Sequence, residues 1–214
     1  MKREIIIFAN SLKHKQRCVA GKCVKTKEWI RPVSTSDGGA INVVDTFVIN
    51  VRKQQKWPLK LLQRAEITFS KAAPLINHQP ENLVISNEPW IDKYKIEKKE
   101  IIDYLDSPSD LWGNGNSIGY QDKNTGCTQQ ILCSLYLIQV SNLKLYTKTF
   151  SEKIRPRASF SYNGINYDLA VTCLAFNDYI KTCSNYDSAI LCISLGEPYP
   201  ADNRCYKLVA SIYI

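Results

Sequence analysis

The sequence is poor in the features that mark helical, exported and membrane proteins. It has one methionine and little of the Ala, Leu, Glu and Lys texture of long helices, which argues against a helical bundle. No apolar run approaches the roughly 18 residues needed to span a bilayer. The apolar run from Ile5 to Ala9 stops at Asn10, too early for a signal-peptide core. We therefore expect a cytoplasmic protein without a membrane partner.

Metal-binding patterns are also missing. None of the eight cysteines belongs to a Cys-x-x-Cys pair, and the only histidines are His14 and His78. Zinc sites usually show tighter paired spacing. Without export the cysteines should stay reduced, and Cys173 and Cys192 lie in apolar runs where cysteine acts as a small hydrophobic residue. We expect neither a metal nor another cofactor.

Catalytic patterns are weak. Ser11 and His14 are three residues apart but lack an identifiable orienting acid. The Gly-rich stretch at 113–119 lacks the strand-to-helix context and the phosphate-binding lysine of a nucleotide motif. Asp103 and Asp106 are more typical of a solvated helix face than of a metal site. The sequence therefore argues weakly against an enzyme, and whether the protein has a catalytic activity stays open.

Aromatic residues are abundant by contrast. Twelve Tyr, four Trp and six Phe favour strands, and 44% hydrophobic residues can form a packed core. A chain of 214 residues is long enough for two domains of about 100 residues each. We predict a mainly β fold of two small OB-like antiparallel barrels, with a short helix and a long loop between them. SH3-like barrels or one larger sandwich would fit the same pattern.

Apolar and alternating runs place the expected elements. In the first half, strands are expected at residues 4–9, 17–21, 28–34, 46–52, 65–70 and 81–86, and a helix at 93–105. In the second half, strands are expected at residues 130–140, 158–172, 188–195 and 206–214. The predicted domains are a first barrel with the helix at 1–106, a linker loop at 107–126 and a second barrel at 127–214.

The clearest local signal is Asn163-Gly164, a two-residue type I′ turn flanked by alternating residues. Such a turn pairs Tyr162 with Ile165 and Phe160 with Tyr167. Paired residues share one face of a sheet, so these four side chains should lie together.

The charge is uneven. Residues 1–71 hold 15 Lys and Arg against 5 Asp and Glu, whereas residues 72–214 hold 13 against 15. A basic surface attracts polyanions, chiefly nucleic acid or anionic membrane, although a solvated face would have the same composition. The first third is therefore the predicted polyanion-binding part.

Several short motifs resemble the dual OB-containing domain family of bacteria. The most specific is Trp29 to Ser34, and others are spread over nearly the whole chain. They are Ile5 to Ser11, Arg17 to Gly21, Ser107-Pro108 through Leu111-Trp112, Ser194 to Pro198, and Cys205 to Ala210.

The resemblance implies two OB folds and a role in bacterial conflict and anti-phage gene neighbourhoods. Binding of nucleic acid or a nucleotide is the role inferred for the family. It supplies no catalytic residues to carry over to this sequence.

Candidate binding residues combine aromatic rings with basic side chains, a combination that suits single-stranded nucleic acid. Trp29 and Arg31 share a strand face and could stack on a base and hold a phosphate, unless Trp29 is a core residue. The whole set comprises Lys13, Arg17, Trp29, Arg31, Arg52, Lys53, Trp57 and Lys60. Asn10, Ser11 and Ser34 are predicted to line a ligand pocket. Arg155-Pro156-Arg157 is a smaller equivalent in the second half.

Three functions are compatible with this sequence. We favour a module that binds nucleic acid or a nucleotide-like ligand through the first barrel. A nucleic-acid-processing enzyme would instead need a deep polar pocket with converging acidic groups. A protein-interaction subunit of a defence complex would need an exposed apolar patch on the second unit.

Overall fold

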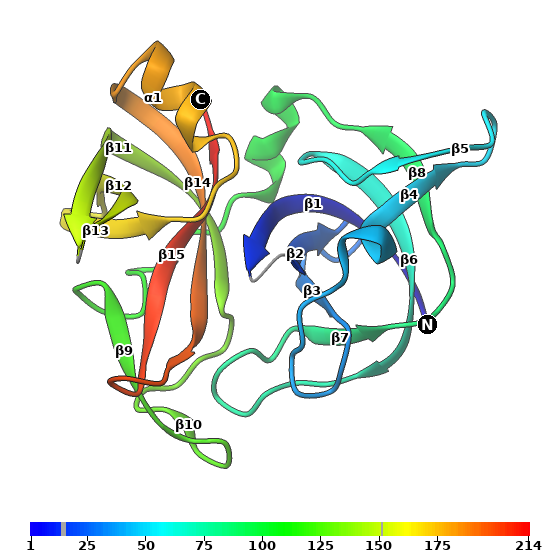
Figure 1. Cartoon of the computed structure of the whole chain (residues 1–214), viewed down its shortest axis with the longest axis horizontal. Coiled ribbons are helices and arrows are strands. Elements are labelled where there is room, and N and C mark those ends of the chain that lie inside the picture. The colour runs from blue at the N-terminus through cyan, green and yellow to red at the C-terminus, as the bar shows by residue number, and fades with distance from the viewer. Residues whose placement is uncertain (14–15, 151) are drawn as a thin grey trace. The chain divides into compact units, whose positions relative to one another are not determined.

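Strands dominate both halves of the chain in the computed structural model, which describes residues 1–13, 16–150 and 152–214 (Figure 1). About 58% of the chain is strand and 9% helical, so the predicted mainly β fold is confirmed. Two units emerge, Met1–Tyr104 and Leu105–Ile214. No helix among the described residues is long and apolar enough to cross a membrane.

The first unit contains a closed five-stranded barrel. Its strands are β1 (Lys2–Lys13), β2 (Gln16–Cys23), β3 (Trp29–Val33), β6 (Gln63–Ala72) and β7 (Asn82–Ile85). They pair in the order β1-β2-β3-β7-β6 and close through β1 and β6, with only β3 and β7 parallel. This Greek-key barrel has the architecture of an OB fold.

Alternate side chains of the strands point inward and fill this barrel. Ile5, Ile7 and Ile30 point inward with Ile67 and Phe69 of β6, and all of them are buried. Gly21 of β2 pairs with Ile7 of β1, and a Cβ on Gly21 would stand 2.2 Å from the Ile6 carbonyl oxygen. The close approach of the two backbones therefore requires glycine at this position.

Three further strands extend the first unit beyond its barrel. They are β4 (Phe47–Asn50), β5 (Gln55–Pro58) and β8 (Trp90–Lys95), and two short 3-10 helices accompany them, η1 (Val43–Thr46) and η2 (Lys98–Tyr104). β8 pairs with β6, and β4 joins β8 and β5 to this sheet.

The helix predicted at 93–105 is wrong over its first part. Lys93–Lys95 belong to β8, and only Lys98–Tyr104 are helical. Trp90 is buried in the first core, and Lys93 forms an ion pair with Glu66 of β6 at 3.1 Å. Pairing with β6 therefore overrides the helix-like spacing of apolar residues.

The second unit repeats the barrel order. Its strands are β11 (Leu135–Phe150), β12 (Lys153–Tyr162), β13 (Ile165–Val171), β14 (Asn185–Tyr199) and β15 (Arg204–Tyr213). They close in the order β11-β12-β13-β15-β14, with β13 and β15 parallel. The helix α1 (Phe176–Thr182) precedes β14. Both predicted OB-like barrels are therefore present.

The hairpin predicted at Asn163-Gly164 is confirmed. Tyr162 pairs with Ile165, and Phe160 pairs with Tyr167. The backbone φ angles of Asn163 and Gly164 are 46° and 77°, as a type I′ turn requires. The Phe160 and Tyr167 rings stack with their centres 5.7 Å apart.

The segment predicted as a linker at 107–126 instead folds with the second unit. It contains β9 (Ser117–Asp122) and the start of β10 (Gly126–Cys127), which add to the β15 edge. Leu111, Trp112 and Ile118 are buried in the second core. The Trp112 indole donates to the Cys133 carbonyl at 2.8 Å and stacks on Tyr136. The unit boundary accordingly lies between Tyr104 and Leu105.

A buried lysine anchors this segment. The Lys207 ammonium of β15 donates to the carbonyl oxygens of Gly113, Asn114 and Gly115 at 2.7, 3.3 and 2.9 Å. Gly113 and Gly115 have φ angles of 77° and 76°, a conformation that glycine adopts without strain. The Gly-rich stretch therefore supplies three backbone carbonyl oxygens that accept hydrogen bonds from Lys207.

Because of Lys207, the free energy of unfolding of the second unit should depend on pH in the alkaline range. Burial lowers the pKa of its ammonium from 10.5 to about 8, and the Asp110 carboxylate opposes this shift. Below about pH 8 folded and unfolded chains both carry the charge, and the burial penalty is fully present. Between about pH 8 and 10.5 the folded chain has released a proton that the unfolded chain retains. The contribution of Lys207 to the free energy of unfolding therefore rises with pH in this window, by up to about 1.4 kcal/mol per pH unit.

Comparison with Lys207→Met isolates this effect from other titrating groups. Urea unfolding at about pH 8 and about pH 10 should show the stability difference moving in favour of the wild type at the higher pH. A difference that stays constant with pH would mean that Lys207 titrates as an ordinary lysine.

Candidate nucleic-acid interface

OB folds bind oligonucleotides on the outer face of their second and third strands, flanked by the loops after strands one and four. In the first unit these strands are β2 and β3, and in the second they are β12 and β13. The two faces differ in what they expose, so each is described on its own.

In the first unit, Trp29 lies on this outer face but is only 9% exposed. Its ring packs edge-on against Phe8 with the centres 6.2 Å apart, and the Lys22 ammonium lies 5.2 Å from the indole centre. Lys22 also donates to the Tyr104 carbonyl at 2.8 Å. The indole is thus part of a packed aromatic cluster, and a stacking role for it stays a prediction.

Arg31 is similarly engaged. Its guanidinium forms an ion pair with Glu81 at 3.2 Å, and both side chains are largely buried. Arg17 is half-buried, and its backbone exchanges two hydrogen bonds with Ile41. The side chain of Lys13 lies outside the described residues. Of the basic side chains that the structure describes here, Arg17 and Arg31 form no exposed row on β2 and β3.

The predicted pocket residues do not converge. Asn10 and Ser11 are neighbours on β1, so their side chains point to opposite faces of the strand. Asn10 points to the Val19 side and donates to the Leu59 carbonyl at 2.9 Å. Ser34 donates to the Ala40 carbonyl within its own loop at 2.8 Å. Strand alternation therefore does not bring Asn10 and Ser11 to one face, and a ligand pocket formed with Ser34 stays a prediction.

The remaining predicted residues lie on or beside the β4–β5 hairpin. Arg52, Lys53 and Lys60 are exposed, whereas Trp57 is half-buried against the first core. Along the sheet, β7, β6 and β8 separate this hairpin from β3. The structure therefore divides the predicted first-unit cluster into two places.

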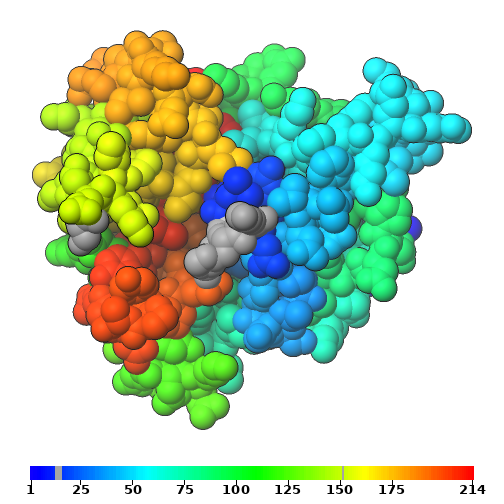
Figure 2. Space-filling view, in the orientation of Figure 1, coloured from blue at the N-terminus to red at the C-terminus, as the bar shows by residue number. Residues whose placement is uncertain are grey.

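The second unit presents a different surface. Leu145 pairs with Ala158 at the last buried rung of β11 and β12, and the next rungs alternate outward and inward from there. The outward rungs are Tyr146 with Arg157, Lys148 with Arg155, and Phe150 with Lys153. We call these six residues the ribbon face. Figure 2 shows this part of the chain, in yellow-green, at the surface of the second unit.

The base of the ribbon face is held by Asp168 of β13. Arg157 donates from Nε to Asp168 Oδ1 at 3.0 Å and from Nη2 to the Asp168 carbonyl oxygen at 2.7 Å, and Nη2 lies 2.8 Å from Oδ1 in an ion pair. Tyr146 donates to Asp168 Oδ2 at 2.6 Å. Burial and this hydrogen bond raise the pKa of Tyr146. Asp168 therefore fixes Tyr146 and Arg157 in one arrangement.

The outer part of the ribbon face is open. Lys148, Lys153 and Arg155 are exposed, and none of them forms an ion pair within the described ranges. Phe150 is 47% exposed, and the Lys148 ammonium lies 5.1 Å from its ring centre. An exposed ring among unpaired cations can stack on a base while the cations hold phosphates.

Only Arg155 and Arg157 of the ribbon face were identified as candidate binding residues from the sequence. The signal that finds it is a period of two, because basic or aromatic residues occur at 144, 146, 148 and 150 and again at 153, 155 and 157. The charge count over residues 72–214 hid this local concentration, since acidic residues elsewhere in that range cancel it.

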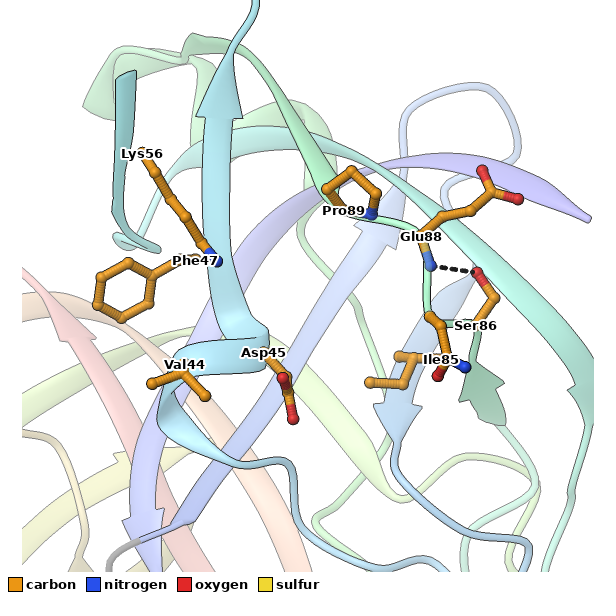
Figure 3. Close-up of a pocket in the computed structure, with 9 residues that line it drawn as sticks. Val44, Asp45, Phe47, Lys56, Ile85, Ser86, Glu88 and Pro89 are labelled. Carbon is orange, nitrogen blue, oxygen red and sulfur yellow. Dashed lines mark hydrogen bonds between the residues drawn. The ribbon is translucent and has the colours of Figure 1, made fainter. Parts of the chain in front are cut away.

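A shallow hollow of about 300 Å³ lies on the first unit between η1, β4 and the turn before β8 (Figure 3). It is lined by Val44, Asp45, Phe47, Lys56, Ile85, Ser86, Asn87, Glu88 and Pro89. Figure 3 shows the Asp45 and Glu88 carboxylates pointing in different directions. The hollow lacks the converging acids that the enzyme hypothesis requires.

The described residues also contain no group of three or more His, Cys, Asp or Glu side chains placed to hold a metal ion.

Comparison with known proteins agrees with the two barrels. No functionally curated protein matches the chain. The model of the dual OB-containing domain matches residues 3–212, nearly the whole length. Two closed five-stranded barrels with the OB order and a match over both of them show that this chain belongs to the dual OB-containing domain family.

Proposed function

We propose that this protein binds single-stranded nucleic acid on the ribbon face of its second barrel. The observation that carries the proposal is the row of Lys148, Lys153 and Arg155 around the exposed Phe150 ring. This row lies on the hairpin between the first and second strands of the barrel, and the loop of that hairpin flanks the oligonucleotide face of OB folds. On β3 of the first barrel, by contrast, Trp29 is packed and Arg31 is paired with Glu81.

The chemistry of the ribbon face suits an unpaired strand. Alternate residues of a strand recur about every 7 Å, so the cations form a line along the ribbon rather than a single cluster. A line of cations can follow a phosphate backbone, and an exposed ring can stack on any base regardless of sequence. The bases of a duplex are already stacked on one another, so a single strand is the better partner for Phe150.

The β4–β5 hairpin is proposed as a second, separate nucleic-acid contact on the first unit. Arg52, Lys53, Lys56 and Lys60 are exposed there, and Trp57 is half-buried. These cations would add phosphate contacts and salt sensitivity, but the half-buried ring offers little surface for stacking.

The biological setting is a further proposal. Because the family is associated with bacterial conflict and anti-phage gene neighbourhoods, we propose a cytoplasmic defence role. A partner protein from the same operon would act on the nucleic acid that this chain recognises.

Replacing Phe150 with Ala should weaken binding to a single-stranded oligonucleotide by about 1–3 kcal/mol, because one stacked base is lost. The slope of log affinity against log salt should stay nearly unchanged, since no phosphate contact is removed. Fluorescence anisotropy across salt concentrations measures both quantities.

Ile154→Ala is the matched control for this substitution. Ile154 is 70% exposed near the same tip, but it pairs with Thr149 on the opposite face of the ribbon. Its loss should leave affinity unchanged. Equal losses from Phe150→Ala and Ile154→Ala would reject specific stacking on the ribbon face.

A further inference from the structure

Two buried cysteines of the second unit are in contact. Cys127 lies on β10 and Cys205 on β15, and their sulfur atoms are 3.9 Å apart. β9 lies between these strands, and the residues that pair with the two cysteines, Ile118 and Tyr120, are two positions apart and share a face. The thiols therefore meet on one side of the sheet, where Cys127 is 2% exposed and Cys205 0%.

We propose that Cys127 and Cys205 form a disulfide when the chain meets a small disulfide oxidant, and that this bond fastens the β9–β10 hairpin to β15. Closing the bond requires the two sulfur atoms to approach by about 1.9 Å, from 3.9 Å to the usual S–S length. Because β9 lies between the two strands, side-chain rotation alone does not close the bond, and β10 at the sheet edge must also move toward β15.

The thiols differ in how easily each starts the reaction. When Cys127 loses its proton, the Cys205 thiol can donate a hydrogen bond to the resulting thiolate. This bond lowers the pKa of Cys127 and raises the pKa of Cys205. Cys127 also belongs to a strand of two residues at the sheet edge, so a local opening of β10 is enough to expose it.

The exchange balances in two steps. The Cys127 thiolate attacks one sulfur of the oxidant, forming a mixed disulfide and releasing the first small thiolate. Cys205 then loses its proton and attacks the Cys127 sulfur, which forms the protein disulfide and releases the second thiolate. The two cysteine protons end on the two released thiolates, and two electrons pass from the cysteine sulfurs to the oxidant.

The bond would stabilise the segment that the structure adds ahead of the second barrel. Residues 105–127 are already tied to β15 by Lys207, two residues after Cys205. A cross-link from Cys127 to Cys205 closes a long loop and restricts the unfolded chain, so the second unit should unfold at a higher temperature.

The test uses the full chain with exposed Cys183 and half-buried Cys18 replaced by Ser, which removes two accessible competitors. After treatment with oxidised glutathione, peptide mapping without reductant should show a Cys127–Cys205 peptide two hydrogen atoms lighter than its parts. The melting temperature should rise and return after reduction. Adding Cys127→Ser should abolish the rise, whereas adding Cys173→Ser, at a buried thiol outside the pair, should preserve it.

The same experiment can also reject the proposed disulfide. If oxidation to completion leaves Cys127 and Cys205 as thiols in the folded chain, the proposal is wrong. A Cys127–Cys205 bond that lowers the melting temperature would reject the fastening role. The peptide map needs no Cys127 variant, so it remains decisive if that variant does not fold.

Discussion

Replacing Lys148, Lys153 and Arg155 together with Gln should lower the affinity for a single-stranded oligonucleotide by roughly one to two orders of magnitude at low salt. Each cation that neutralises a phosphate releases counterions, so three lost contacts should also reduce the salt slope by about 2. The three side chains are exposed, and the substitutions should therefore leave folding intact. Anisotropy titrations at several salt concentrations measure the affinity and the slope together.

A variant of equal charge serves as the control. Replacing the exposed Lys95, Lys123 and Lys181 with Gln removes the same charge at positions that do not belong to the ribbon face. This control should keep most of the affinity and the slope. If both triple variants weaken binding equally, net charge rather than the ribbon face attracts the ligand.

Replacing Trp112 with Ala should lower the free energy of unfolding of the second unit by about 3–5 kcal/mol. Trp112 is 5% exposed, stacks on Tyr136 with ring centres 4.6 Å apart, and donates to the Cys133 carbonyl. Its loss leaves a cavity and an unpaired carbonyl in a packed region. Urea unfolding followed by circular dichroism measures the change.

Leu132→Ala is the companion variant, because Leu132 is 79% exposed and its loss should change stability by less than about 0.5 kcal/mol. An unchanged unfolding curve for Trp112→Ala would mean that residues 105–116 are a linker and not part of the second unit.

Features set by neighbouring residues could be predicted from the sequence. The Asn163-Gly164 turn needs only two residues with positive φ and alternating flanks, so its pairing follows directly. The apolar runs that became β1, β6 and β14 were similarly clear, and the short motifs around Trp29 and Cys205 indicated the family.

Features set by distant residues could not be predicted. The stretch at 107–126 has the Gly and Asn content of a loop, yet the ammonium of Lys207 binds three of its carbonyl oxygens from 92 to 94 residues further along the chain. The strand at Trp90–Lys95 likewise depends on β6 for its pairing partner. Local composition carries no information on either contact.

In the candidate site, too, features set by neighbouring residues could be predicted and features set by distant residues could not. The sequence singled out Arg52, Lys53 and Lys60 as cations, and these are exposed on or beside the β4–β5 hairpin. Composition could not show that Arg31 is paired with Glu81 or that Trp29 packs on Phe8. The ribbon face was hidden because its cations alternate with Thr, Ile and Pro along two strands. Only the register of β11 with β12 brings them onto one side.

Recognition of nucleic acid by this chain is tested most directly by the salt dependence of binding by the wild-type protein. With single-stranded oligonucleotides, log affinity should fall linearly with log salt, by about 0.7 for each phosphate contacted. The loss of slope in the Lys148, Lys153 and Arg155 variant then places those contacts on the ribbon face. Folded wild-type protein that shows no salt-sensitive binding to any oligonucleotide, even at low ionic strength, would contradict the proposed function.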